Sequence, residues 1–285
     1  MSTRASGTDA RPNRRVIRIA LLAACVGLAA SSSALVATAD PGRPQSIRPR
    51  ASRSEGLPWD GRLVRAVRLE PSAAVRYAGA YAAADNFWGT WELVQLVQRA
   101  GAHVARRHPG ARLTVGELSR KTGGEIPGHA SHENGRDVDL AFYMLDGAGR
   151  PHQPWAFAAF RADGTAPPPN EGLRFDDARN WELVARLLTD ADARVQFIFV
   201  SRAIQARLLA QARRARAPAR ILERARQVMV QPSGAHPHAN HFHVRIYCPP
   251  DDRPRCQDRP PFWPWYPGFV GRPLGDPPVN ARAAR

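Results

Sequence analysis

The amino-acid sequence predicts an α+β fold, in which an antiparallel sheet of about four strands is flanked by helices. Three observations support this prediction. Apolar residues recur at helical spacing between Trp91 and Val104. Short segments rich in valine, isoleucine and phenylalanine, typical of strands, occur at residues 196–200 and 241–246. Proline and glycine residues, such as Pro109-Gly110, separate the segments.

The expected helices and strands are interspersed along the chain. Pro109-Gly110 ends the first helix, and Pro218 separates the last two because proline lacks the N–H that a helix interior needs. A proline-rich stretch at residues 166–170 predicts a loop. The sequence predicts helices at residues 91–104, 178–188, 204–216 and 219–228, and strands at residues 112–118, 137–143, 196–200 and 241–246.

Two distant segments carry the residue types of a hydrolytic metal site with one zinc ion. His132 precedes Asp139 with six residues between them, and far downstream His241 and His243 flank Phe242. A catalytic zinc usually has three protein ligands and keeps one position for water, whereas a structural zinc has four, commonly cysteines. His132, Asp139 and His243 therefore predict a catalytic Zn²⁺ site, and no further cofactor is expected.

The second segment predicts a strand with two different faces. Successive side chains of a strand point to opposite sides, so His241 and His243 share one face while Phe242 and Val244 share the other. We expect His243 to bind the metal and His241 to carry protons beside it, a role suited to a group that titrates near neutral pH. His238 is a second candidate for proton transfer.

Other readings of these histidines and carboxylates remain open. A single histidine is more often a surface or hydrogen-bonded core residue than a ligand, so the prediction depends on the joint occurrence of the motifs. His129 is predicted as a further metal contact, with a substrate contact or an ordinary loop residue as alternatives. Asp137, on the same strand face as Asp139, is more typical of a group that hydrogen-bonds to a ligand.

The motifs together resemble those of the penicillin-insensitive murein endopeptidases, within the wider group of lysostaphin-type and D-Ala-D-Ala metallopeptidases. The resemblance covers roughly residues 57–258. It departs at Glu133 and Arg136, where the family more often has glutamine and an apolar residue. The matching motifs are Gly128-His129-Ala130-Ser131-His132, Gly135, Asp137-Val138-Asp139 and His238-x-x-His241-x-His243.

The resemblance implies a hedgehog/DD-peptidase-like fold and a zinc-dependent peptidase. It implies zinc bound by the residues matching His132, Asp139 and His243, and acid–base catalysis by those matching His241 and His238. The position of His129 contributes to further metal binding in some members. The expected reaction is hydrolysis of D-alanyl cross-links between the stem peptides of peptidoglycan. A zinc D,D-carboxypeptidase and a non-catalytic, zinc-containing protein that binds the cell wall are the alternatives.

The amino-terminal sequence predicts export to the periplasm or secretion. Arginines at positions 11, 14 and 15 precede an apolar run at residues 19–30, and Ala37-Thr38-Ala39 resembles a cleavage site, which predicts a signal peptide at residues 1–39. The run is short for a membrane span, so no span is expected after cleavage. Lipoprotein processing at Cys25 is the alternative. A flexible linker is expected at residues 40–56, the zinc peptidase domain at residues 57–266, and a tail rich in proline and arginine at residues 267–285.

Cysteine content and charge suggest the chemistry of the compartment and of the partner. Removal of the signal leaves Cys248 and Cys256, which we expect to form a disulfide outside the cytoplasm. A structural zinc at these cysteines is the alternative. The formal charge of +16 favours polyanionic partners. Peptidoglycan is the expected partner, nucleic acid is not expected because no nucleic-acid-binding motif occurs, and the sequence predicts no oligomeric state.

Overall fold

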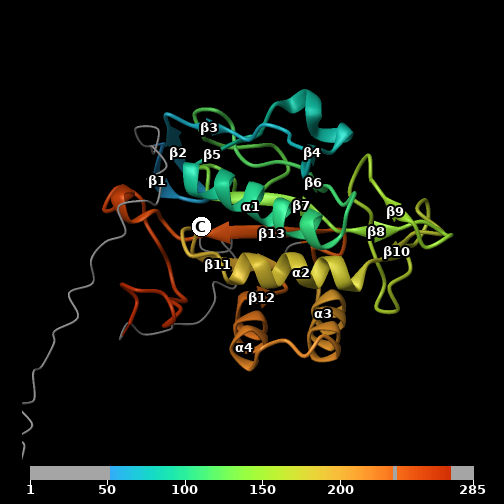
Figure 1. Ribbon diagram of the computed structural model, residues 1–285. Coiled ribbons are helices and arrows are strands. Elements are labelled where there is room, and N and C mark those ends of the chain that lie inside the picture. Colours follow the sequence, from blue (N-terminus) through green and yellow to red (C-terminus); the bar gives the residue numbers. More distant parts are fainter. Residues whose placement is uncertain (1–51, 234–235, 271–285) are drawn as a thin grey trace, which may run out of the picture. The chain divides into compact units, whose positions relative to one another are not determined.

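A computed structural model describes residues 52–233 and 236–270, which belong to one compact unit (Figure 1). The predicted signal peptide, residues 40–51 of the predicted linker and residues 271–285 of the predicted tail lie outside the described residues. Within the described part, no helix combines the length and the apolar composition that crossing a membrane would require.

The central sheet has six strands, not about four, and it is mixed. Its middle strands β6, β7, β13 and β11 are antiparallel and correspond to the four strands that the sequence predicts. The strands at the two edges pair in parallel with their neighbours and are too short to give a sequence signal. In spatial order the strands are β12 (Met229–Val230), β11 (Val195–Phe199), β13 (His241–Ile246), β7 (Asp137–Ala141), β6 (Leu113–Val115) and β4 (Val75–Tyr77).

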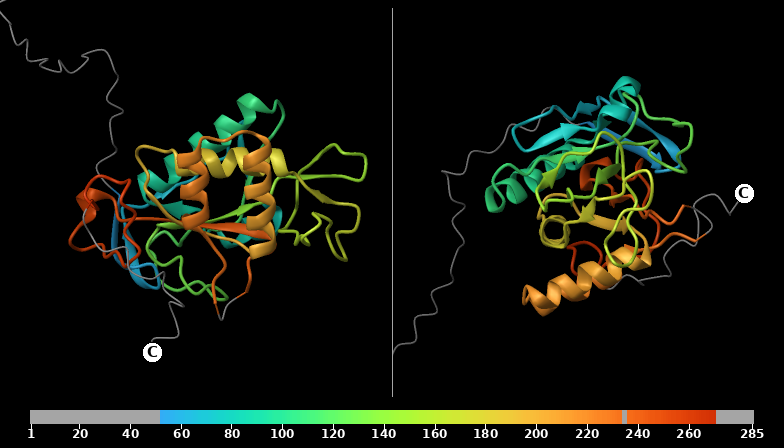
Figure 2. Two further views of the ribbon diagram at one scale, coloured as in Figure 1. Left: turned by 90° about the horizontal axis from the view of Figure 1, so that it is seen from below. Right: turned by 90° about the vertical axis from the view of Figure 1, so that its right-hand side faces the viewer.

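Helices cover the sheet on the side seen from the front in Figure 1, where α1 and α2 run across it (Figures 1 and 2). Thr90, Asp176 and Ser201 each accept a hydrogen bond from a backbone N–H of the first turn of a helix, which satisfies a donor that the helix leaves unpaired. The four predicted helices are confirmed, as α1 (Trp91–Arg107), α2 (Asp177–Leu188), α3 (Arg202–Arg214) and α4 (Ala219–Val228).

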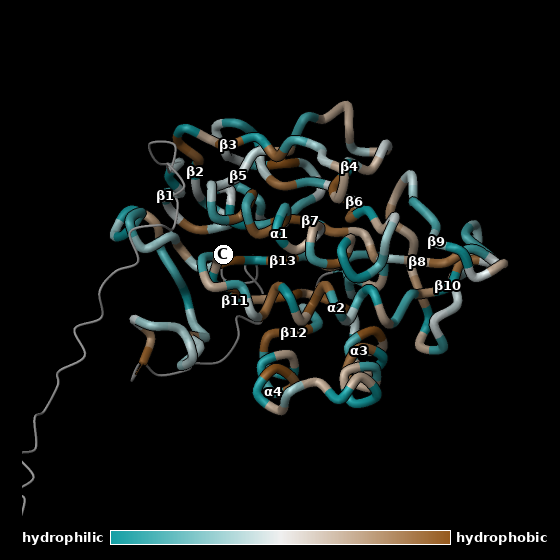
Figure 3. The backbone as a smooth tube through the Cα atoms, in the orientation of Figure 1, coloured by the Kyte–Doolittle hydropathy of each residue, from teal (hydrophilic) through white to brown (hydrophobic). Residues whose placement is uncertain are grey.

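Strand alternation separates the hydrophobic core from the polar face of the sheet. Phe242, Val244 and Ile246 are at most 1% exposed and belong to the core cluster, as the sequence predicts. Phe242 packs edge-on against Phe142, with ring centroids 4.6 Å apart. Figure 3 shows hydrophobic stretches along the central strands and on the helices that cover them. The opposite face of β13 is therefore left to His241 and its neighbours.

Smaller elements surround this sheet. The 3-10 helix η1 (Gly79–Ala84) follows β4, and η2 (Pro250–Asp252) follows β13. Three further pairings complete the fold: the hairpin of β1 (Arg53–Leu57) and β2 (Asp60–Val64), the pair β3 (Val67–Arg68) and β5 (Trp88–Gly89), and the small sheet of β8 (Met144–Leu145), β9 (Pro151–His152) and β10 (Arg174–Phe175).

Both ends of the ordered domain extend beyond the predicted boundaries. β1 begins at Arg53, inside the segment predicted as a linker, because it pairs with β2 and because the backbone N–H of Ser54 donates to Asp252. At the other end Phe269 is fully buried, although the predicted tail begins at residue 267. These contacts connect distant parts of the chain, so the composition of either end could not reveal them.

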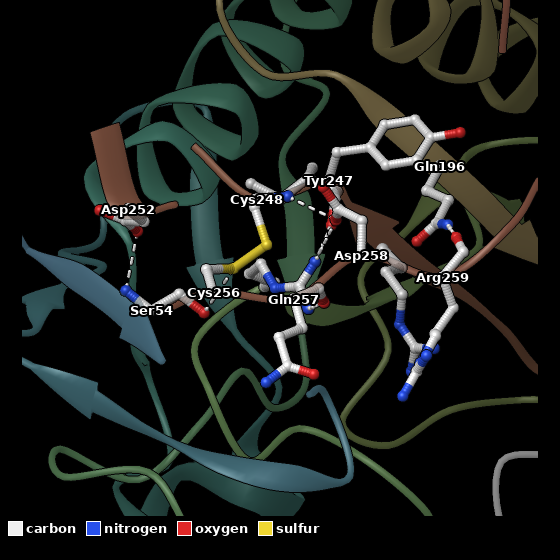
Figure 4. Close-up of polar contacts among 12 residues, drawn as sticks. Ser54, Gln196, Tyr247, Cys248, Asp252, Cys256, Gln257, Asp258 and Arg259 are labelled. Atoms are coloured by element: carbon white, nitrogen blue, oxygen red, sulfur yellow. Dashed lines mark hydrogen bonds and ion pairs between the residues drawn. A yellow bond between two sulfur atoms is a disulfide. The ribbon is translucent and has the colours of Figure 1, made fainter. Parts of the chain in front are cut away.

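The predicted disulfide between Cys248 and Cys256 is confirmed (Figure 4). It closes the loop that follows β13. The backbone N–H of Cys248 donates to Oδ1 of Asp258 at 2.9 Å, and Nη1 of Arg136 lies 3.0 Å from the same oxygen. The fully buried Arg136, one of the departures from the family pattern, therefore has a buried carboxylate as its partner.

Removal of the disulfide is expected to destabilise the domain. The two cysteines are eight residues apart, and closing so short a loop restricts the unfolded chain by about 2.5 kcal/mol. The variant Cys248→Ala/Cys256→Ala should lower the free energy of unfolding by about that amount in urea denaturation. An unchanged unfolding midpoint in this variant would contradict the expectation.

Candidate active site

The carboxylate of Asp139 is the centre of a cluster of histidines. Three imidazole nitrogens surround its Oδ1 atom: Nε2 of His132 at 3.3 Å, Nε2 of His241 at 3.4 Å and Nδ1 of His243 at 3.6 Å. Nδ1 of His129 lies 3.7 Å from the second oxygen, Oδ2. Side chains that are up to 114 residues apart in the sequence thus converge on one carboxyl group.

The pairing of β7 with β13 places these groups. In its register, His243 is opposite Asp139 and Arg245 is opposite Asp137. Directly paired residues of neighbouring strands point to the same face, so these side chains lie together on the polar face. His132 comes from the loop before β7 and has a φ of 80°, a backbone conformation that is uncommon for residues with a side chain.

In His132 and His241, a hydrogen bond to Nδ1 fixes the ring so that the other nitrogen, Nε2, faces Asp139. Nδ1 of His132 faces the carbonyl oxygen of Leu118, which can only accept, so that nitrogen carries the proton and Nε2 is free to act as a ligand. Nδ1 of His241 lies 2.7 Å from Oδ1 of Asn240. Each of these two rings therefore presents Nε2 to the carboxylate.

The donor atoms fit a tetrahedral zinc ion. Ligand atoms about 2.0–2.1 Å from such an ion are about 3.3 Å from one another, close to the separations of His132 and His243 from Asp139 Oδ1. Nε2 of His132 and Oδ1 of Asp139 are buried and have no hydrogen-bond partner in the described structure. Buried polar atoms normally have partners, and these two atoms, which face each other at 3.3 Å, are suited to bind a cation together.

Two sets of residues share the His132–Asp139 pair. His129, His132 and Asp139 have donor atoms that all lie within 4.8 Å of one another. The set with His243 in place of His129 converges on a single oxygen, Oδ1, whereas His129 faces Oδ2. His243 is the ligand that the sequence predicts, and its Nδ1 atom lies 3.6 Å from Oδ1 of Asp139. The three-residue group whose donor atoms are all mutually close has His129 in that place.

His129 has a carboxylate partner that the sequence did not reveal. Its Nε2 atom lies 2.8 Å from Oε2 of Glu117, and Nδ2 of Asn86 donates to the other carboxylate oxygen at 2.8 Å. Glu117 lies on the connection after β6 and belongs to none of the motifs, so only the folded chain associates it with the site.

His238, the second predicted proton carrier, lies beside the strand histidines. Its ring centroid is 4.9 Å from that of His241 and 5.5 Å from that of His243, and its φ is 53°. The structure thus brings together every residue that the sequence singled out for the site.

Two opposing effects set the pKa values of the site residues: burial disfavours the charged form of each group, and neighbouring groups of opposite charge favour it. Burial acts to raise the pKa of Asp139, but the imidazoles, above all His132, outweigh it and hold this pKa well below its usual range. Burial acts to lower the pKa of His132, yet Asp139 and Asp137 raise it to about 9. Burial prevails elsewhere and lowers the pKa of His243 to about 4 and that of His238 to about 3.

Asp137 connects the loop that carries His132 to the strand β13. The sequence predicts such a hydrogen-bonding role for it. It is fully buried, accepts the backbone N–H of His132 at 3.1 Å, and lies 3.2 Å from Nε2 of His243. Arg245 compensates its charge with hydrogen bonds of 2.6 and 3.1 Å. The Arg245 guanidinium also lies over the rings of Trp59 and Phe199.

Aromatic rings that the sequence did not indicate border the site on the side of His241. Phe157 stacks on His241 with ring centroids 4.6 Å apart, and Tyr81 of η1 packs against Phe157 at 4.8 Å. Gly116 provides the space for this arrangement, because a Cβ atom there would lie 2.2 Å from the Phe157 ring.

Comparisons with known proteins agree on one family. The sequence model of the family described as penicillin-insensitive murein endopeptidase matches residues 56–265. A protein of that name from Shigella dysenteriae serotype 1 is 29% identical over 246 residues, 85% of this chain and 80% of the relative. Another, from Escherichia coli O157:H7, is 29% identical over 247 residues, with the same two shares. One from Pectobacterium atrosepticum is 30% identical over 178 residues, 61% of this chain and 57% of the relative.

The Asp137–Arg245 pair is expected to show strong energetic coupling. Arg245→Met leaves the buried Asp137 carboxylate without its cationic partner. The free energy of unfolding, measured in the presence of a chelator so that no metal is bound, should fall by about 3 kcal/mol. Adding Asp137→Asn removes that charge and should restore part of the loss. Urea denaturation of both single variants and the double variant completes a double-mutant cycle. Additive losses would show that the two residues are independent.

Proposed function

The chain belongs to the penicillin-insensitive murein endopeptidase family, and on this premise we propose that it is a zinc endopeptidase that hydrolyses D-alanyl cross-links between peptidoglycan stem peptides. The observation that carries the proposal is the buried Asp139 carboxylate, whose Oδ1 atom has three imidazole nitrogens within 3.6 Å. The names of the relatives support a peptidoglycan hydrolase.

In this proposal His132, Asp139 and His243 hold the zinc ion, and His129 adds a peripheral contact. Two imidazoles and one carboxylate leave the ion with a net positive charge. Zinc bound in such a site acts as a Lewis acid towards a carbonyl oxygen and lowers the pKa of its water to about 7. Asp137 and the Leu118 carbonyl keep the two ligand rings in orientation.

His241 is the proposed proton carrier. Asn240 holds its Nδ1 atom and Phe157 covers one face of its ring, so Nε2 is directed into the cluster. From there the protonated ring can donate to the amide nitrogen that leaves when the peptide bond breaks. His238 is the second candidate for proton transfer, because its ring lies 4.9 Å from that of His241.

Two alternatives use the same residues. A D,D-carboxypeptidase would release terminal D-Ala from monomeric stem peptides instead of converting dimers into monomers. A wall-binding protein without turnover would bind sacculi and cleave nothing. The presence of both His241 and His238 favours an enzyme, because a purely structural zinc site does not need proton carriers. Peptidoglycan lies outside the cytoplasm, as does a protein exported by the predicted signal peptide. We therefore include a periplasmic or secreted location in the proposal.

Digestion of purified cross-linked muropeptide dimers tests the reaction and the separate roles of the histidines. Zinc-loaded protein should convert dimers into monomers, and chelation should abolish this activity reversibly. His243→Ala should lose both zinc and activity. His241→Ala should retain most of the zinc while turnover falls at least about a hundredfold.

The variant His103→Ala on α1, outside the cluster, serves as the control and should match the wild type. Mass spectrometry of the products identifies the scissile bond, and release of D-Ala from monomers would indicate the carboxypeptidase instead. Equal loss of zinc in the His241 and His243 variants would refute the role proposed for His241.

Zinc binding should be linked to the release of a proton from His132. Its pKa of about 9 in the zinc-free fold exceeds the unfolded value, so the proton stabilises the zinc-free fold below pH 6.5, and this contribution is lost between pH 6.5 and 9. The ligand form is unprotonated, so apparent zinc affinity should rise up to about tenfold per pH unit in that range.

Calorimetry in buffers of different ionisation enthalpy measures the protons released per zinc bound. We expect about one proton at pH 7.5 from this group. A release close to zero at pH 7.5, where His132 of the zinc-free fold is protonated, would contradict the expectation.

A further inference from the structure

Trp155 is the one exposed aromatic side chain among residues 52–233 and 236–270, and it is 70% exposed. Single exposed apolar residues are common and by themselves indicate nothing. Trp155 differs from such residues in two respects. Its segment is held in place by hydrogen bonds, and Phe157, two residues further along the chain, stacks on His241 of the candidate site.

Contacts on three sides fix the segment that carries Trp155. Oγ1 of Thr114 donates to the Gln153 side chain at 3.4 Å, and Nη1 of Arg76 donates to the carbonyl oxygen of Pro154 at 3.0 Å. The backbone N–H of Ala80 donates to the carbonyl oxygen of Trp155 itself, also at 3.0 Å. The segment is therefore attached to β4 and η1 through its backbone and to β6 through the Gln153 side chain.

The ring is positioned as well. It packs on the backbone of Gly79 so closely that a Cβ atom there would lie 1.9 Å from the six-membered ring. Gly79 has an ordinary φ, so its backbone does not require glycine, and the absence of a side chain serves the contact with the indole. One side of the indole thus packs on η1, while most of the side chain remains open to solvent.

The indole and two rings beside the histidine cluster share the element η1, because Trp155 packs on Gly79 of η1 and Tyr81 belongs to the same element. Phe157, two residues along the chain, stacks on His241, and Tyr81 of η1 packs on Phe157. Burial and the charges of Asp139 and Glu117 raise the pKa of Tyr81, which places its hydroxyl within electrostatic reach of the site. A substrate bound at His241 can therefore extend over Phe157 and Tyr81 towards Trp155.

We propose that Trp155 is a sugar-binding platform that takes an N-acetylated hexose ring of the glycan to which the stem peptide is attached. A pyranose ring has a face of C–H groups, which packs on the electron-rich face of an indole, while its hydroxyl groups at the edge stay in water. The stem peptide separates this sugar from the cross-link by only a few residues, each spanning about 3.4 Å when extended. The inference deepens the proposed function and rests on it for the identity of the polymer.

Two matched substrates test this inference. One is a cross-linked muropeptide dimer that carries its disaccharides, and the other is the same peptide dimer after an amidase has removed the sugars. The wild type should cleave the first with kcat/KM about five- to tenfold higher. Trp155→Ala should lose this preference and retain wild-type activity on the sugar-free dimer.

Three further variants separate binding from folding. Gly79→Ala should displace the indole and reproduce the effect of Trp155→Ala at an unchanged unfolding temperature. Trp155→Phe should keep part of the preference, and His152→Ala, on the preceding strand β9, should keep all of it. Equal cleavage of both dimers by the wild type, or equal losses on both in Trp155→Ala, would overturn the inference.

Direct binding keeps this test independent of turnover. Titration of the zinc-loaded wild type with the soluble N-acetylglucosamine–N-acetylmuramic acid disaccharide, followed by NMR, should shift the Trp155 indole N–H resonance. The same titration of Gly79→Ala should show weaker binding. If the wild type cleaves no dimer, the proposed function fails, but the titration still shows whether Trp155 binds the disaccharide. Absence of any shift would refute it.

Discussion

The antiparallel register between β7 and β13 is the constraint on which the rest of the site depends. It places His243 opposite Asp139 and Arg245 opposite Asp137 on one face of the sheet. The other face of β13 is fixed by burial, because Phe242, Val244 and Ile246 are almost entirely enclosed by core residues. A slip by one residue would bury the histidines and expose the apolar side chains. The energetics of the core therefore fix the geometry of the polar cluster.

Two buried carboxylates with one residue between them have different functions on this scaffold. Asp139 faces imidazole nitrogens that can share a cation with it, and its Oδ1 atom has no hydrogen-bond partner among the described residues. Asp137 accepts hydrogen bonds from Arg245 and from the backbone N–H of His132, and it lies 3.2 Å from Nε2 of His243. A buried negative charge is tolerated only with compensation. Arg245 compensates one carboxylate, and the histidines, with the proposed zinc, compensate the other.

The contacts around the cluster suggest how a polymeric substrate is accommodated. On one side, Phe157 and Tyr81 extend the surface from His241 towards Trp155. On the other side, Phe199 packs edge-on against His243 and Trp59 lies under the Arg245 guanidinium. The disulfide and the Arg136–Asp258 pair hold the loop that leaves β13. Asp139 and His243 thus belong to central strands, whereas the surrounding rings come from loops, from η1 and, in the case of Phe199, from the end of β11.

The sequence by itself determined the features that depend on local pattern: the four long helices, the four central strands, the two faces of β13 and the disulfide. It also pointed to six residues, whose roles remain a proposal, that the fold brings together. These features follow from periodicity, from the spacing of ligand-type side chains and from the redox compartment. The tertiary structure alone decided the parallel edge strands, the ordered segments at both ends, and the inclusion of Glu117, Phe157 and Tyr81 in the site. These features arise from contacts between distant residues that belong to no motif. Their energy comes from packing and pairing in the folded chain, which leaves no periodic signal in the sequence.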